Sequence, residues 1–324
     1  MRLPRRMLGF APVLAFLAAA SVVDIGWFAF APGSPRDVLP RIELEGVETH
    51  PPDGRLMLTT VSVPWATMAT AVRAILDPAI TLVPEEDVLG GRTEQEYEQL
   101  TRSQMDESKI AAVALAARRL TDYPREHGPG ALVQNVVAGS PAEGKLFPGD
   151  LIVAADDEPV GGVEELAGLI ERTEGERAMT LTIEAGGEER AARIRPRFSG
   201  EEQRPLLGVV LVESFPFEVS IDSGDIGGPS AGLMWTLGVF ELLSEEDLLG
   251  GRVVAGTGAV TLDGRVLPIG GIEQKVRAAD RARADVFLVP RENARAARSV
   301  GPGLRLVPVG SVGEAIRALR SVPS

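Results

Sequence analysis

The sequence predicts an α+β fold preceded by an N-terminal transmembrane helix. Segments with β-type alternation and segments with helical spacing are interspersed along the chain, and no internal repeat is detectable. The chain has 324 residues, of which 44% are apolar, so it can form two or three domains with packed cores. A long apolar run also follows the basic residues Arg2, Arg5 and Arg6.

This apolar run extends from Met7 to Val23 and continues beyond Asp24 to Ala31. A membrane-spanning helix needs about 20 apolar residues. We therefore expect residues 1–31 to form a cytoplasmic basic tip and an uncleaved anchor. The basic cluster should stay in the cytoplasm, so the rest of the chain would lie outside, attached to the cell membrane by a single pass.

Three aromatic residues, Trp27, Phe28 and Phe30, occupy the place of an interfacial aromatic belt at the outer end of this anchor. Two alternatives remain open. The run could be a cleaved signal peptide with its small-residue site at 18–20, or it could be a buried core helix.

The composition excludes several classes of function. The formal net charge of -13 argues against nucleic acid as a partner. The absence of cysteine removes disulfides, thiolate metal sites and a cysteine nucleophile. The only histidines are His50 and His127, so a histidine-rich metal centre is excluded, and we expect neither a metal nor a cofactor.

Beyond the anchor, residues 32–54 are rich in proline and glycine and predict a linker. The hydrophobic patterns then predict strands at 55–63, 131–137, 151–155, 179–184, 207–212, 217–221 and 286–289 and helices at 68–76, 94–120, 163–172, 230–243 and 272–284.

The most informative segment is GGPSAG, residues 227–232, which precedes apolar residues at helical spacing. Ser230 would stand at a helix N-terminus, where free backbone N–H groups can hold an oxyanion. Gly228 lets the backbone approach a bound peptide, and Ala231 belongs to the same turn. The simpler interpretation, that Ser230 is an ordinary helix cap, remains open at this point.

A second motif, GGIEQK at 270–275, opens another predicted helix and ends on Lys275. Only three of the 33 basic residues are lysines, the others being Lys109 and Lys145, so each lysine requires an explanation. Burial would lower the pKa of the Lys275 amine, and a neutral lysine can take the proton of a serine. The alternative is a solvated charge on a helix surface.

These two motifs together closely resemble the proteolytic domain of Lon-type Ser-Lys peptidases. The resemblance runs from about Phe217 to Pro290 and includes TGAVTLDGRVLPIGGIEQK. It implies that Ser230 is the nucleophile, that Lys275 is the general base and that Thr257 helps to hold the lysine. Many Lon enzymes carry an aspartate three residues before the serine, where this chain has Gly227.

No GxxxxGK[ST] motif occurs in the sequence, so we expect an activity that is independent of ATP. We expect the substrates to be flexible or unfolded proteins and peptides. The oligomeric state stays open.

The segment GSPA…GDLI, with its surroundings at residues 125–198, resembles a bacterial PDZ domain. The resemblance implies that an extended peptide is added beside a strand. By position, we expect the groove to be lined by Gly130, Ala131, Leu132, Val133, Leu166 and Leu169. The alternative is that the glycines only form turns and the leucines only form core.

The order of anchor, PDZ segment and Lon-type segment resembles anchored bacterial Lon-like PDZ proteases. It implies that residues 55–124 belong to the peptidase fold of residues 206–324 and that strand 55–63 pairs with that block, which makes the PDZ domain an insertion. The leading hypothesis is a membrane-anchored serine endopeptidase. The competing hypotheses are a non-catalytic PDZ scaffold and a serine hydrolase that uses His127.

Overall fold

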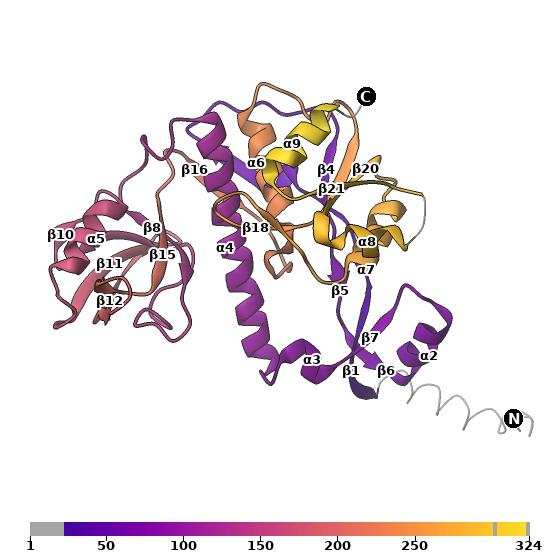
Figure 1. Cartoon of the computed structure of the whole chain (residues 1–324), viewed down its shortest axis with the longest axis horizontal. Helices are drawn as coiled ribbons and strands as arrows, with labels where there is room; N and C mark the ends of the chain where they lie inside the picture. Colours follow the sequence, from indigo (N-terminus) through magenta and orange to yellow (C-terminus); the bar gives the residue numbers. More distant parts are fainter. Residues whose placement is uncertain (1–22, 301–302, 322–324) are drawn as a thin grey trace, which may run out of the picture.

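The computed structural model describes residues 23–300 and 303–321. In the described residues a main domain lies between a middle domain, residues 131–213, and a small β-sheet near the start of the described chain (Figure 1). The main domain and the middle domain each have their own hydrophobic core.

A five-stranded sheet forms the centre of the main domain. Its order is β2 (Arg36–Asp37), β4 (Arg55–Leu58), β17 (Val253–Gly256), β20 (Val286–Pro290) and β21 (Arg305–Val309). All neighbouring strands are parallel except β2, which pairs antiparallel with β4. Because β4 precedes the middle domain in the sequence and β17 follows it, the middle domain is an insertion in the main domain.

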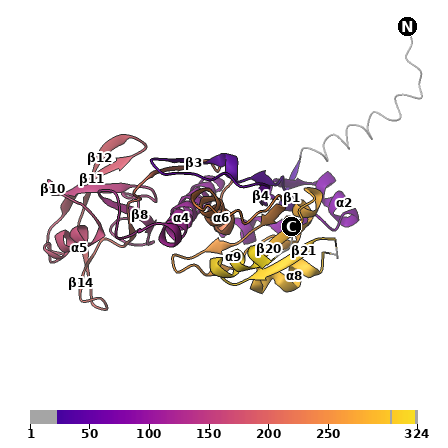
Figure 2. The same cartoon turned by 90° about the horizontal axis from the view of Figure 1, so that it is seen from above.

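Helices cover both faces of this sheet (Figure 2). Leu56 and Leu58 belong to the core formed with α4 (Glu94–Leu120), α6 (Gly232–Leu243) and α9 (Val312–Ser321). Met57, between them in the sequence, belongs to the core on the other face, with α7 (Ile272–Arg281) and α8 (Ala294–Arg298). This alternation follows from the two-residue period of a strand.

Helix α4 is the longest helix in the described part of the chain. It starts with a capping box, in which the Thr93 hydroxyl accepts from the N–H of Glu96 and the Glu96 carboxylate accepts from the N–H of Thr93. Its second half is rich in alanine and buried, so its backbone can lie close to α6.

Short elements complete the main domain. β3 (Ile42–Glu45) pairs with β16 (Glu218–Ile221), and β18 (Ala259–Val260) pairs with β19 (Val266–Leu267). Three short 3₁₀ helices lie at η1 (Leu39–Arg41), η2 (Pro229–Ala231) and η3 (Arg291–Asn293).

The middle domain is built on a sheet of order β12 (Glu188–Ile194), β11 (Met179–Ala185), β9 (Leu151–Ala155), β8 (Ala131–Val136) and β15 (Val209–Glu213). β10 (Glu158–Pro159) pairs with β9, and β13 (Arg197–Ser199) pairs with β14 (Arg204–Leu206). Helix α5 (Val163–Glu171) packs on this sheet. β15 is an edge strand.

The small sheet places β1 (Asp24–Pro32) between β5 (Val61–Ser62) and β6 (Trp65–Thr67), with β7 (Thr81–Pro84) also paired to β1. Its two helices are α2 (Met68–Leu76) and α3 (Glu85–Leu89).

The structure corrects the prediction of a spanning helix that continues to Ala31. Residues 24–32 are strand β1, and Phe28, expected in an aromatic belt, stacks on Trp65. Trp27 and Phe30 lie in the same strand. No helix in the described ranges is long and apolar enough to cross a membrane. Residues 1–22 lie outside the described residues, and with them most of the expected anchor.

Two expected boundaries also differ from the structure. Residues 32–54 are not simply a linker, because β2 joins the central sheet and β3 pairs with β16. The block that was expected to begin at residue 206 begins later, because β15 (Val209–Glu213) belongs to the sheet of the middle domain. Short strands that pair over a long sequence distance leave little local pattern, which explains both differences.

Candidate active site

Ser230 lies in the 3₁₀ turn η2, immediately before α6. Gly228 precedes this turn with φ of 83°, a backbone conformation that favours glycine. The N–H of Gly228 donates to the carbonyl of Thr101 on α4, at 2.7 Å. A backbone hydrogen bond therefore fixes the turn that carries Ser230 to helix α4.

Lys275 lies in the first helical turns of α7 and points to the same place. Its Nζ is 2.7 Å from the Oγ of Ser230 and 3.1 Å from the Oγ1 of Thr257. Gly271, which caps α7 with φ of 67°, lets this helix approach the neighbouring chain, because a Cβ there would lie 2.6 Å from the Cγ2 of Val61. The two sequence motifs thus meet in one hydrogen-bonded cluster.

Burial sets the electrostatics of the lysine. Lys275 is 4% exposed. Removing the ammonium from water disfavours its charged form, and this lowers the pKa of Lys275 to about 7. A substantial fraction of this amine is therefore neutral near pH 7 and can accept a proton from the serine hydroxyl.

Thr257 connects the serine and the lysine. Its Oγ1 accepts from Lys275 Nζ and donates to the backbone carbonyl of Ser230, at 2.9 Å. The N–H of Gly258 donates to the same carbonyl at 2.8 Å. Two donors therefore fix the main chain of the serine, while the threonine hydroxyl fixes the amine.

We expect Thr257→Val to lower kcat for peptide cleavage without unfolding the protein. The substitution keeps the shape but removes a hydroxyl that makes two hydrogen bonds, a loss of about 1–3 kcal/mol, equivalent to roughly 5- to 150-fold in rate. Steady-state kinetics together with thermal unfolding would measure both effects. Thr257→Ser keeps the hydroxyl and is the control, so it should retain most of kcat. Full kcat in Thr257→Val would contradict the bridging role.

Backbone donors are available where an oxyanion would form. The N–H groups of Ser230 and Ala231 lie in the first turn of the helical segment, where amides have no helical acceptor. Donors fixed in such positions can stabilise a tetrahedral intermediate.

The cluster opens into a cleft of about 560 Å³. Its walls include Phe30 and Pro32 from β1, the extended segment 59–63, and the loop that precedes Ser230. Asp225 also lines the cleft but is exposed and lies 3.7 Å from Arg36. The hydrogen bonds of the Lys275 amine go to hydroxyl groups, and among the described residues no carboxylate is hydrogen-bonded to it.

Helix α4 supports the serine loop at a second point, which the sequence analysis missed. Ser108 is buried, and its Oγ donates to the carbonyl of Pro229 at 3.2 Å. Its neighbour Glu107 accepts a 2.8 Å bond from Asn135 of the middle domain. Ser108 and Glu107, adjacent residues of α4, thus contact the serine loop and the middle domain, respectively. Only the polar interruption of an apolar helical face by Ser108 could have signalled this.

The two histidines lie outside the cleft. The Nδ1 of His127 is 2.7 Å from the carbonyl of Gly128 and 3.8 Å from the Oε2 of Glu213 in the middle domain. His50 is bonded through its backbone N–H to Leu242, at the far end of α6 from Ser230. The other lysines are also elsewhere: Lys109 pairs with Asp106, and Lys145 donates to the carbonyl of Arg193.

The groove of the middle domain differs from the expected one. Leu132 and Val133 lie on β8, which has β9 on one side and β15 on the other, so they present no free strand edge. Gly130 and Ala131 precede or begin this strand. Leu166 is fully buried in the core, and Leu169 is nearly so.

The groove of the middle domain instead lies between α5 and the edge strand β15. It has a volume of about 330 Å³. Val163, Ala167 and Ile170 line it from the helix, and Val209 and Leu211 line it from the strand. Residues 205–208, the end of β14 and the link to β15, also line it. The sequence analysis missed this groove because one of its walls is β15, whose pairing with the sheet of the middle domain is not evident from local sequence.

Comparison with protein families gives two matches. Residues 218–319 match the Lon protease (S16) C-terminal proteolytic domain, and residues 132–184 match the PDZ domain. The first match contains both Ser230 and Lys275, and the second contains β9, α5 and all of β8 except its first residue.

Similar proteins agree with the first match. The chain is 42% identical to the Lon protease of Chloroflexus aggregans over 101 residues, which are 30% of this chain and 12% of that protein. It is 33% identical to the Lon protease of Desulfosudis oleivorans over 157 residues, which are 47% of this chain and 18% of that protein. The chain thus spans less than a fifth of the length of these relatives.

Among solved structures, the PDZ domain of the SdrC-like protein from Listeria monocytogenes is 24% identical. The match covers 26% of this chain and 87% of that chain, with a TM-score of 0.25. The two family matches confirm the resemblances predicted from the motifs. This chain therefore contains a C-terminal proteolytic domain of the Lon protease (S16) family, with a PDZ domain inserted between the elements of the main domain.

Proposed function

We propose that this protein is a membrane-anchored serine endopeptidase that works without ATP and uses a Ser230–Lys275 dyad. The observation that carries the proposal is the 2.7 Å contact between Lys275 Nζ and Ser230 Oγ in a buried position beside an open cleft. A neutral amine at hydrogen-bond distance from a hydroxyl is the arrangement that activates a serine nucleophile.

The reaction follows from these positions. The Lys275 amine takes the proton of Ser230 as Oγ attacks the scissile carbonyl, and the backbone N–H groups of the serine turn stabilise the oxyanion. The lysine then returns the proton to the leaving amine. A water molecule, deprotonated by the same amine, hydrolyses the ester and restores Ser230.

Independence of ATP is supported by the absence of a GxxxxGK[ST] motif from the 324 residues. Without a motor, the cleft would accept segments that are already extended or unfolded. The test is cleavage of an unfolded protein such as reduced casein by the full chain in detergent, with and without ATP. Equal rates are expected, and a rate that requires ATP would contradict the proposal.

The pH dependence of kcat/KM tests the state of the amine. Below the pKa of Lys275, about 7, the base is protonated, so we expect kcat/KM to fall about tenfold per pH unit there. Above this pKa, kcat/KM should level off. A histidine base would titrate in a similar range, so the matched control is His127→Gln, which should leave the profile unchanged. Loss of the profile in His127→Gln would favour the histidine mechanism instead.

For the PDZ domain we propose binding of an extended peptide in the α5–β15 groove. The observation in favour is the combination of an edge strand, which offers unpaired backbone groups, and apolar walls for alternate side chains. Such a peptide would bring a substrate to the cleft or regulate the cleft through the contacts of α4.

We expect Ala167→Arg to block this groove. Ala167 is half-buried on α5 and lines the pocket, so a long charged side chain would occupy the place of an apolar anchor. Fluorescence polarisation with a library of decapeptides that end in apolar residues, free and amidated, would measure the loss. Glu164→Arg, on the exposed side of the same helix, is the control. Unchanged peptide binding in Ala167→Arg would exclude this groove.

A further inference from the structure

Helix α2 exposes an apolar face to solvent. Met68 is 50% exposed, Val72 55%, Ile75 83% and Leu76 80%. Their spacing of four, seven and eight residues from Met68 places them on one side of a helix. None of the residues of α2 is buried. Large apolar residues gathered on one exposed face usually mark an interaction surface.

The packing of the small sheet leaves this face without a function in folding. The core beneath the helix consists of Ala29, Ala66 and Ile80, and α2 contributes Ala74 to it. The helix therefore docks on the sheet through a small residue, and its larger side chains point elsewhere. Figure 1 shows α2 beside β6 and β1, at the opposite end of the molecule from the hairpin β11–β12.

The chemistry of the surroundings indicates what would cover this face. α2 contains no acidic residue, and its only charged residue is Arg73, although the whole chain has a net charge of -13. At the start of the described chain, Val23 is 61% exposed and Trp27, in β1, is 40% exposed. The nearest carboxylates in the sequence are Asp24, at the start of β1, and Asp77, which follows the last residue of α2. Within the helix itself, apolar residues with an arginine and no carboxylate are typical of helices that lie in a membrane interface.

The sequence outside the structure supports the same partner. Residues 7–22 are an uncharged, mostly apolar run that follows three arginines, and this run joins the described chain directly at Val23. β1, which begins at Asp24, is in contact with α2. In the sequence, the apolar run therefore leads directly into the strand that contacts the apolar helix.

We propose that α2 is an interfacial helix that rests on the lipid surface with Met68, Val72, Ile75 and Leu76 among the headgroups and upper acyl chains. The proposal rests on membrane attachment by residues 7–22, which belongs to the proposed function. Docking of α2 would also fix the distance between the active site and the membrane surface. β1 runs from the α2 end of the sheet to the cleft wall at Pro32, at most roughly 30 Å for nine extended residues. Chain segments close to a membrane would be within reach of Ser230.

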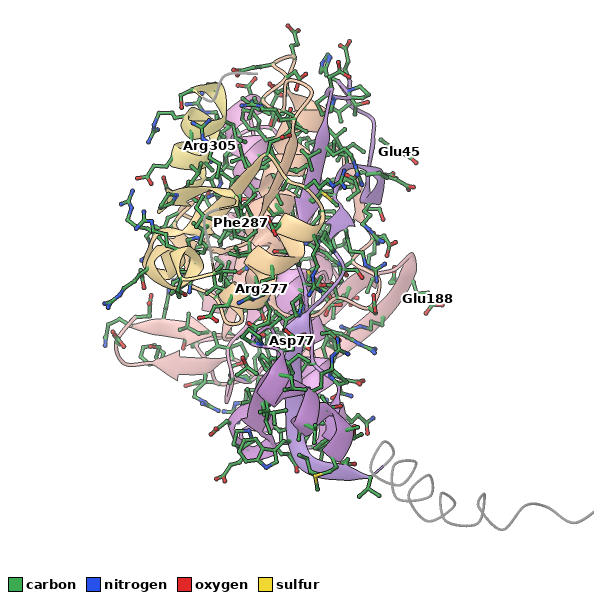
Figure 3. The ribbon with its side chains drawn as sticks, turned by 90° about the vertical axis from the view of Figure 1, so that its right-hand side faces the viewer. Glu45, Asp77, Glu188, Arg277, Phe287 and Arg305 are labelled. Carbon is green, nitrogen blue, oxygen red and sulfur yellow. The ribbon has the colours of Figure 1, made fainter. Side chains whose placement is uncertain are left out.

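The absence of cysteine allows a direct test in the full chain, because any introduced cysteine is unique. Ile75→Cys and Val72→Cys carry an environment-sensitive fluorophore on the proposed face. Glu188→Cys, exposed at the start of β12 in the PDZ domain and labelled in Figure 3, is the control, because β12 and the small sheet lie at opposite ends of the molecule in Figure 1. Each protein is reconstituted into phosphatidylcholine–phosphatidylglycerol vesicles, with and without brominated acyl chains, and flotation is measured in parallel.

We expect all three proteins to float with the vesicles, but only the labels at positions 72 and 75 to shift to the blue and to be quenched by brominated lipid. The double variant Ile75→Asp with Leu76→Asp, at highly exposed positions, should keep its fold and flotation, while a label at position 72 loses its quenching. These results would support docking.

Failure to float would refute membrane attachment itself. Flotation with a water-exposed label at position 75 would refute docking while attachment stands. A blue shift that depends on protein concentration and not on brominated lipid would identify a second copy of the chain as the partner. A blue shift independent of both would assign the face to residues 7–22 of the same chain. Each of the last two results overturns the lipid proposal.

Discussion

Replacement of Ser230 by alanine is expected to lower kcat/KM for peptide cleavage by about 10⁴- to 10⁶-fold, the loss typical of a removed serine nucleophile. Without Oγ no acyl-enzyme can form. The fold should persist, because Ser230 is held through its backbone carbonyl by Thr257 and Gly258. Within residues 23–300 and 303–321, its side chain is bonded only to Lys275. The assay is hydrolysis of a quenched fluorescent peptide, with circular dichroism to follow the fold.

The matched control is Ser220→Ala, at an exposed position on β16. It should leave kcat/KM unchanged. Activity of Ser230→Ala within tenfold of the wild-type value would show that another group attacks the substrate, and the dyad would have to be abandoned.

Lys275→Arg is expected to cause a loss of similar size, at least about 10³-fold in kcat/KM. Arginine keeps the positive charge but cannot lose its proton, so it cannot serve as a base. Because a guanidinium is larger than an ammonium and the Lys275 side chain is buried, Lys275→Met is the companion variant. Methionine has the length of the lysine stem and no charge to bury, so this variant should fold and be equally inactive.

Lys145→Arg is the control for the first of these variants, since its amine only donates to the carbonyl of Arg193 at the surface. It should retain full activity. If Lys275→Met folds and still cleaves peptides at a rate close to that of the wild type, Lys275 is not the base.

Much of the site could be predicted from local sequence. The glycines and proline around Ser230 indicate a turn before a helix, and the rarity of lysine draws attention to Lys275. Both signals are local, because a helix start depends on neighbouring residues. The 2.7 Å contact between the two side chains is not local. It depends on Thr257, directly after β17, whose hydroxyl bonds to both the carbonyl of Ser230 and the amine of Lys275.

The parts that could not be predicted depend on pairing at long range. Residues 24–31 have the composition of a membrane segment, yet they form β1 because 61–67 and 81–84 provide partner strands on both sides. The resemblance to PDZ domains places the groove strand by position at 132–133, which is on β8. The edge of the groove is β15, which returns about 75 residues later. Ser108 interrupts the apolar face of α4 with one buried hydroxyl, a signal that shows a polar contact but does not name the serine loop as its partner.

The most direct measurement of the central claim is covalent labelling of the nucleophile as a function of pH. The full chain is treated with a peptidyl phosphonate that reacts with activated serines, and the modified residue is located by mass spectrometry. We predict one phosphonylated residue, Ser230, with a labelling rate that rises with the neutral fraction of an amine of pKa about 7 and is absent in Lys275→Met. Labelling of a different serine, or of Ser230 at an equal rate in Lys275→Met, would contradict a lysine-activated serine in this cleft.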